Sequence, residues 1–155
     1  MEFAMLRPAG ALQLLGAVSR DVWHGLRPGT APATMAISRH ALVTLLDEVS
    51  AVAGHLAEQV ADSADGQPRA NAASICRWEL GRVRAKVGAI PTDSTDRRHQ
   101  SMILKRLDDA ATAAQILSAG YRFHSLDRIC SGGHSLDDQF EALARLRVKL
   151  VASQE

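Results

Sequence analysis

A four-residue repeat, His-Ser-Leu-Asp, is the most unusual feature of the sequence. The first copy begins at His124 and ends at Asp127, and the second begins at His134 and ends at Asp137. In each copy the histidine and the aspartate are three residues apart, so on a helix they would share one face. Metal sites in the cores of helical bundles use ligand pairs with this spacing. These four residues are therefore candidate metal ligands.

The same repeat also has a purely structural interpretation, which we favour. Serine followed by leucine and aspartate is typical of the first turn of a helix, where the hydroxyl caps free N–H groups and the acid lies near the positive end of the helix dipole. In the second copy, Ser135 and Asp138 have the spacing of a capping box. We therefore expect the pairs to lie at helix ends and on the surface, with no bound metal and no other cofactor.

Three other stretches pair a histidine with an acid at the same spacing: residues 21–24 (Asp-Val-Trp-His), 55–58 (His-Leu-Ala-Glu) and 96–99 (Asp-Arg-Arg-His). The last two carry a further resemblance. They resemble the metal-binding helices of the DinB-like four-helix bundles. The resemblance implies a metal held by these two helices. It is restricted to these short stretches, and the second has Thr95 where that family usually carries another histidine one turn earlier.

Catalytic motifs are missing from the sequence, so we do not expect an enzyme. There is no Gly-x-Ser-x-Gly, phosphate-binding loop, dinucleotide fingerprint or His-Glu-x-x-His motif. Cys130 and His134 would align on a helix, but Gly132 and Gly133 lie between them, and we expect these glycines to interrupt it. Cys76 is the only other cysteine. Two cysteines are too few for a disulfide scaffold, which favours a reducing, cytoplasmic location.

Charge is unevenly distributed along the chain, although the formal net charge is only +1. Residues 36–66 carry one arginine and five acids, whereas residues 67–106 carry nine basic residues and three acids. This basic region could follow a phosphate backbone, so nucleic-acid binding is an alternative function. The residues that would carry it are Arg77, Arg82, Arg84, Lys86, Arg97, Arg98, Lys105 and Arg106. The simpler interpretation is a solvated face that complements the acidic segment before it.

Helices are the elements that must position these residues. The chain is rich in alanine and leucine and has only six aromatic residues, a composition that favours helices over strands. Apolar residues recur at spacings of three and four in five segments, at about 9–26, 36–62, 76–90, 103–121 and 135–150. The pattern predicts an all-α, antiparallel bundle of four to five helices. We expect one domain over 1–155, with an N-terminal extension at 1–8 and an irregular connection at 120–134.

One large side chain does not fit the core of this bundle. The segments at 36–62 and 76–90 should pack as neighbours, with Leu45, Val49, Leu80 and Val83 in the core. At 100° per residue, Trp78 lies on the face of its helix nearly opposite these core positions. It is therefore either a docking residue or covered by another helix, either the one at 135–150 or the one at 9–26.

The residues that follow Trp78 are those that a docking surface would carry, and both interpretations stay open. Arg82 lies one turn further along, where its guanidinium can stack on the indole, and Lys86 lies one turn beyond it. Tryptophan and arginine are enriched at the energetic centres of protein interfaces. The sequence thus predicts a non-catalytic interaction module or a small subunit of a larger assembly, with a protein partner or a second copy of itself. No apolar run approaches the length needed to cross a bilayer, so we do not expect a membrane partner.

Overall fold

The computed structural model describes residues 31–153, and the side chains among them from residue 37 onward. These residues form four helices, α2 (Ala31–Asp62), α3 (Gly66–Gly88), α4 (Ser94–Arg122) and α5 (Leu126–Ala152), and no strand. The extension predicted at 1–8 and the helix predicted at 9–26 lie outside the described residues. From Met35 onward the chain forms one compact unit.

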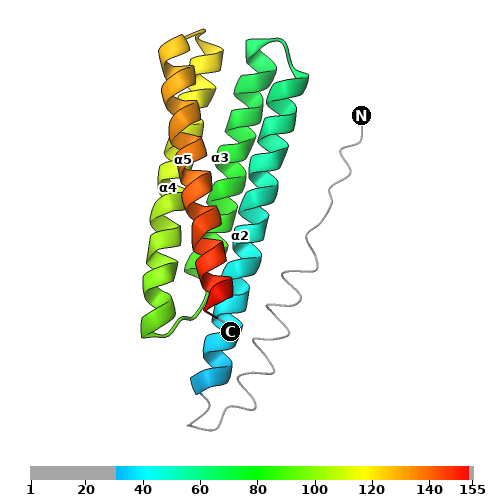
Figure 1. Cartoon of the computed structure of the whole chain (residues 1–155). Coiled ribbons are helices and arrows are strands. Elements are labelled where there is room, and N and C mark those ends of the chain that lie inside the picture. Colours follow the sequence, from blue (N-terminus) through cyan, green and yellow to red (C-terminus); the bar gives the residue numbers. More distant parts are fainter. Residues whose placement is uncertain (1–30, 154–155) are drawn as a thin grey trace. The chain divides into compact units, whose positions relative to one another are not determined.

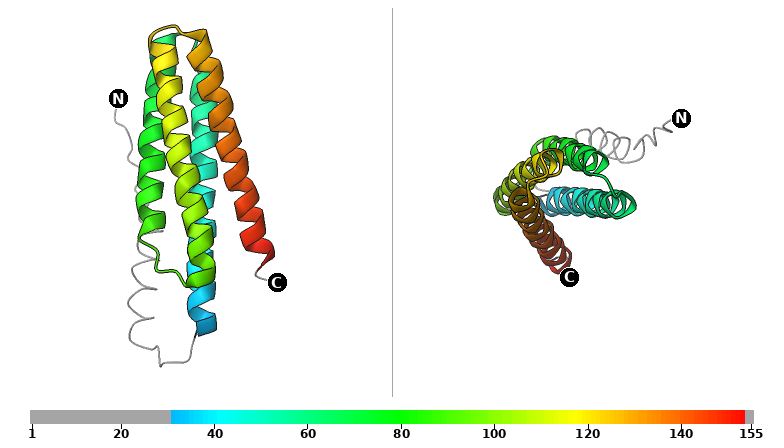
Figure 2. Two further views of the ribbon diagram at one scale, coloured as in Figure 1. Left: turned by 90° about the vertical axis from the view of Figure 1, so that its left-hand side faces the viewer. Right: turned by 90° about the horizontal axis from the view of Figure 1, so that it is seen from above.

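Within this unit the four helices run alternately up and down, as Figure 1 shows. Short loops at 63–65, 89–93 and 123–125 join consecutive helices and make them antiparallel neighbours. Helix α5 also reaches α2, because Arg147 bonds to Asp47 of α2. The views along and across the helices in Figure 2 agree with this order. The unit is therefore an all-α antiparallel bundle, as predicted.

Aliphatic side chains from all four helices form the core. Leu45 and Val49 of α2 and Leu80 and Val83 of α3 are all buried, which confirms that they belong to the core. A bond from Lys86 of α3 to Glu48 of α2 shows that these two helices are neighbours, as predicted. The apolar side of α4 is lined largely by leucine and alanine, and its buried members include Leu107, Ala110, Ala114 and Leu117. Because alanine is small, the neighbouring helices can approach α4 closely, which suits a core that is poor in aromatic rings.

The irregular connection predicted at 120–134 is wrong. Helix α4 continues to Arg122 and α5 begins at Leu126, so only three residues form the turn, and His124 among them has a positive φ of 51°. Gly132 does not break α5. A Cβ at this position would lie 2.7 Å from the backbone nitrogen of Leu117 on α4, so the glycine is where the two helices touch.

The structure defines where α4 and α5 begin, and the helix start predicted at Ser135 is wrong. At the start of α4, the Asp93 side chain accepts hydrogen bonds from the backbone nitrogens of Thr95 and Asp96 and caps the helix. Ser125 is the N-cap residue of α5, although its side chain makes no capping bond. Ser135 lies inside α5, so the capping box predicted there is wrong. Only the first copy of the repeat is at a helix start.

Among the helices that the structure describes, none combines the length and the apolar composition needed to cross a bilayer.

Candidate interaction surface on helix α3

Helix α3 lies between α2 and α4, and polar contacts fix its rotation. On the α2 side, the Lys86 ammonium donates to Glu48 at 2.7 Å. On the α4 side, Arg84 pairs with Asp108. The core side carries Cys76, Leu80, Val83 and Val87, all of which are buried. One face of α3 is left without a neighbouring helix in the described part of the chain.

This free face carries Trp78, which is 63% exposed. The guanidinium carbon of Arg82 lies 4.9 Å from the centroid of the indole, within the range of a cation–π contact. Ile75, one turn before Trp78, is 43% exposed. We refer to Ile75, Trp78 and Arg82 as the α3 outer surface. Ile75 was not among the sequence candidates, although its spacing of three residues from Trp78 could have identified it.

The placement of Lys86 beside Trp78 and Arg82 is wrong. The Lys86 side chain is directed towards α2. There Glu48 binds its ammonium, and the Lys86 side chain is largely buried. Lys86 therefore joins α3 to α2 and does not belong to the α3 outer surface.

The basic residues proposed for nucleic-acid binding are used in different ways. Arg84 and Lys86 are in ion pairs, Arg82 is stacked on Trp78, and Arg106 bonds to Gln139 of α5. The side chains that make no ion pair or hydrogen bond within the described residues are Arg77, Arg97, Arg98 and Lys105. Half of the predicted set is thus already engaged within the bundle.

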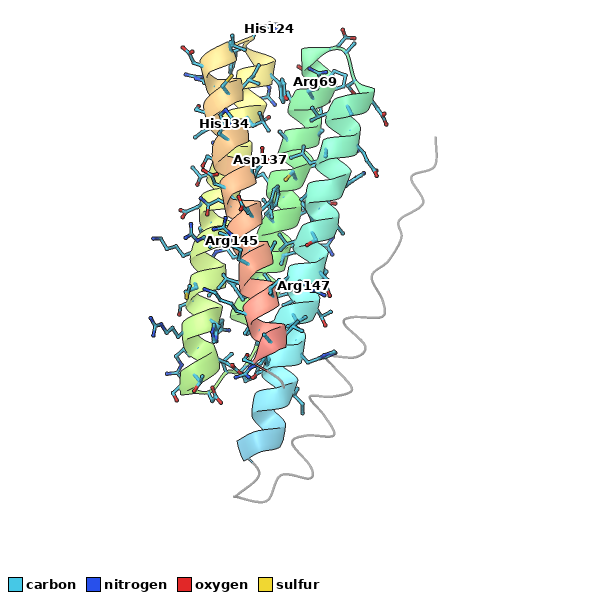
Figure 3. The ribbon with its side chains drawn as sticks, viewed as in Figure 1. Arg69, His124, His134, Asp137, Arg145 and Arg147 are labelled. Carbon is cyan, nitrogen blue, oxygen red and sulfur yellow. The ribbon has the colours of Figure 1, made fainter. Side chains whose placement is uncertain are left out.

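The histidine repeat does not form a metal site in the described part of the chain. His124 lies at the turn between α4 and α5, whereas His134 and Asp137 lie further along α5, as the labelled side chains in Figure 3 show. Nowhere in residues 37–153 do three or more histidine, cysteine, aspartate or glutamate side chains come together in a way that could hold a metal. The four candidate ligands are surface residues.

The two stretches that resemble DinB-like helices are also far apart. Asp96 accepts a hydrogen bond from Ser38, near the start of α2. His55 is 17 residues further along the same helix, which at 1.5 Å per residue is about 25 Å. Residues 55–58 and 96–99 therefore lie towards opposite ends of the bundle, and they cannot share one metal ion.

Asp96 forms a buried polar cluster that sequence reasoning missed. Its side chain is fully buried and accepts a hydrogen bond from the Ser38 hydroxyl at 2.8 Å and from two Arg39 nitrogens at 3.3 and 3.2 Å. Arg39 also donates to the Ser153 carbonyl at 2.9 Å, just after α5. The cluster thus ties α2, α4 and the end of α5 together. The sequence signal was only an acid three residues before His99, which does not reveal burial.

Serine, histidine and aspartate meet in this cluster, but not in a catalytic order. In a nucleophilic triad the hydroxyl bonds to the imidazole, which acts as its base. Here the Ser38 hydroxyl donates to the Asp96 carboxylate. The His99 Nδ1 atom is 4.0 Å from Asp96 and has no hydrogen-bond partner among the described atoms. Within the described residues this arrangement joins helices, and it places the serine hydroxyl on the carboxylate and not on the imidazole.

Neither cysteine has a base as a hydrogen-bond partner among the described residues. Cys76 is buried in the core, and this burial, with a smaller contribution from the charge of Glu79, raises the pKa of its thiol to about 12. Cys130 is exposed and lies one turn before His134 on α5, because the glycines between them do not interrupt the helix. No hydrogen bond within the described residues joins the thiol to the imidazole.

A shallow hollow lies on the surface near the α4–α5 turn. It is lined by Thr112, Gln115, Ile116, Ala119 and Arg128. Arg128 is its one titratable side chain, so the hollow offers neither an acid and base pair nor a nucleophile with a base.

Comparison of the chain with models of protein families, with characterised proteins and with solved structures gives no match. The assignment of a function therefore depends on the geometry of the bundle and its surface.

Proposed function

We propose that the protein is a non-catalytic helical interaction module, or a small subunit of a larger assembly, that binds a protein partner through the α3 outer surface. The observation that supports this is the 63% exposure of Trp78, with Arg82 stacked on its ring. A large indole in water is a source of binding free energy, because covering it removes apolar area from solvent. The stacked Arg82 restricts the ring, so little side-chain entropy is lost on binding.

Nucleic acid is the alternative partner, through the basic residues of 67–106. Arg77, Arg97, Arg98 and Lys105 are the members of that set that remain available to phosphates. Electrophoretic mobility shifts at low and moderate salt separate the two proposals. Binding through phosphates would weaken steeply as salt rises, whereas a partner held on Trp78 and Ile75 by apolar contacts would be much less sensitive.

We also place the protein in a reducing compartment, the cytoplasm. The support is that both cysteines are free thiols and that one of them, Cys130, is exposed.

Native affinity purification of the full chain as wild type, Trp78→Ala and Phe123→Ala tests the docking surface. Trp78→Ala should lose the partner with little change in melting temperature, because the indole makes few contacts that stabilise the fold. Phe123→Ala is the matched control, since this aromatic residue is 68% exposed at the α4–α5 turn and is not part of the α3 outer surface. It should keep the partner. Retention of the same partner by Trp78→Ala would contradict the proposal, as would a large loss of thermal stability.

A further inference from the structure

Large and small side chains are distributed unevenly along the free face of α3. The large side chains, Ile75 and Trp78, lie in its N-terminal half, and Arg82 follows them. One and two turns beyond Arg82, the same face carries only Ala85 and Ala89, both exposed. Beside the centre of the face is Gly81, where a Cβ would meet nothing within 4 Å. One half of the face is therefore bulky and the other half is flat.

We propose that the partner bound by this face is a second copy of the protein, with the two α3 helices antiparallel about a two-fold axis that passes between Trp78 and Arg82. This inference rests on the proposed function and names its partner. With the axis at this level, Ile75 faces the partner's Ala85, and Trp78 faces the partner's Arg82. Ile75 of each copy thus fits the flat half of the other, and the indole of each copy lies against a guanidinium of the other, which is the self-complementarity that a two-fold interface requires.

The charges beside the face also match in this register. Glu79, on the α2 side, makes no ion pair among the described residues, and it comes level with the partner's Arg82. Arg77, on the α4 side, comes level with the pair formed by the partner's Arg84 and Asp108. The half-exposed carboxylate of Asp108 can accept from both guanidinium groups. Two charges that have no ion partner among the described residues thus meet opposite charges in the dimer.

The size of the contact indicates a dimer that dissociates on dilution. From Asn71 to Ala89 the face is about 27 Å long, at 1.5 Å per residue. A single pair of helices over this length buries less than the roughly 1,600 Å² of a standard stable interface. We therefore expect monomer at low concentration and dimer at high concentration.

Sedimentation velocity of the full chain over a range of concentrations tests the association. We expect Trp78→Ala to weaken it by about thirtyfold or more, because about 2 kcal/mol is typical for loss of a central tryptophan. Phe123→Ala should associate like the wild type. Ala85→Glu provides an independent test on the flat half of the face, because it adds a long, charged side chain at an exposed helical position that no core contact uses. It should abolish the dimer without lowering the melting temperature.

Disulfide trapping tests the antiparallel register. In a Cys130→Ser background, Gly81→Cys should oxidise readily to a covalent dimer, because residue 81 is about 3 Å along the helix from its own counterpart across the axis. Asn71→Cys should not, because its counterpart is about 27 Å away along the helix. Equal trapping of both variants would contradict the antiparallel arrangement.

The results also separate this inference from the proposed function. A chain that stays monomeric at all concentrations, yet captures a different protein in a Trp78-dependent way, would overturn the dimer and leave the docking surface in place. A monomer in which Trp78 emits like a buried indole, measured in a Trp23→Phe background, would mean that residues 1–30 occupy the face. This would overturn both proposals, as would a dimer that Trp78→Ala and Ala85→Glu leave unchanged.

Discussion

Cys76 is a residue whose proton equilibrium changes when the chain folds. Burial against the core of the bundle, assisted by the nearby charge of Glu79, raises the pKa of its thiol from 9.0 to about 12. In the unfolded chain the thiol loses its proton near the ordinary value, whereas in the folded chain it keeps the proton. Its contribution to stability is therefore complete below about pH 9 and is lost as the pH rises towards 12.

This linkage predicts an alkaline instability that depends on Cys76. Above about pH 9 the free energy of unfolding should fall by up to about 1.4 kcal/mol per pH unit more in the wild type than in Cys76→Ala. Urea titrations at several pH values give these free energies directly. Cys130→Ala is the control, and it should keep the wild-type slope because Cys130 is exposed. Identical pH profiles for the wild type and Cys76→Ala would contradict the shifted pKa.

At the scale of single residues, the sequence located part of the candidate surface. Trp78 was identifiable because it interrupts an otherwise regular apolar spacing, and Arg82 because a step of four places it over the ring. Lys86 was misplaced because the same step was extended once more without knowing where α2 lies. The attraction of Glu48 for its ammonium decides the direction of that side chain. Such an ion pair between two helices depends on how the two segments pack. The spacing of residues within one segment gives no information about that packing.

At the scale of elements, the contact between α4 and α5 depends on two glycines. A Cβ at Gly120 would lie 2.7 Å from the backbone nitrogen of Ile129, and one at Gly132 would lie 2.7 Å from that of Leu117. Real Cβ atoms do not approach backbone atoms this closely, so any larger residue would push the helices apart. Gly133, the next residue, has open space around it. Two adjacent glycines on one helix therefore have opposite requirements.

This contrast predicts opposite effects of the same substitution. Gly132→Ala should destabilise the bundle by about 1–3 kcal/mol, because the methyl group forces the backbone of α4 away. Gly133→Ala should be neutral or stabilise it by up to about 1 kcal/mol, because alanine favours the helical conformation more than glycine does. Thermal or urea unfolding of both variants gives the comparison. If both were equally destabilising, the close contact at Gly132 would not be the cause.

The helices were predictable to the extent that their apolar spacing is regular. The leucines and valines of α2 and the apolar residues of α4 indicated two long helices, and both are present. The start of α5 was not predictable in this way, because the segment after residue 120 contains glycines and few apolar residues. A glycine can end a helix or let two helices touch, and the sequence of one helix does not distinguish these cases. The position of Leu117 on α4, against Gly132, shows that here the glycine lets two helices touch.

At the scale of the whole molecule, the buried Asp96 carboxylate joins three helices. Asn in its place would keep the shape but remove the charge that the Arg39 guanidinium requires. Because the Arg39 side chain is only 14% exposed, loss of its counter-charge should strongly lower the free energy of unfolding. The Arg84 and Asp108 pair provides a contrast, since both of its side chains are about half exposed.

We expect an Asp→Asn substitution to have a large effect on stability in the buried ion pair and a small effect in the exposed one. Asp96→Asn should lower the free energy of unfolding by about 3 kcal/mol, as expected when a buried ion pair loses one partner. Asp108→Asn, the matched control, should lower it by less than about 1 kcal/mol, because water replaces the lost contact. Urea denaturation measures both. Two similarly small effects would show that the cluster around Asp96 does not hold the bundle together.

The bond from Arg39 to Ser153 also has a consequence for the order in which the protein folds. It joins residues 114 apart in the sequence, whereas Arg84 and Asp108 are 24 apart. In an unfolded chain, closing the longer loop costs about 1.4 kcal/mol more entropy than closing the shorter one. The hairpins of consecutive helices should therefore form first, and the end of α5 should be fixed on α2 last. During synthesis Ser153 is made after α2, α3 and α4, so this closure also comes after those helices have been made.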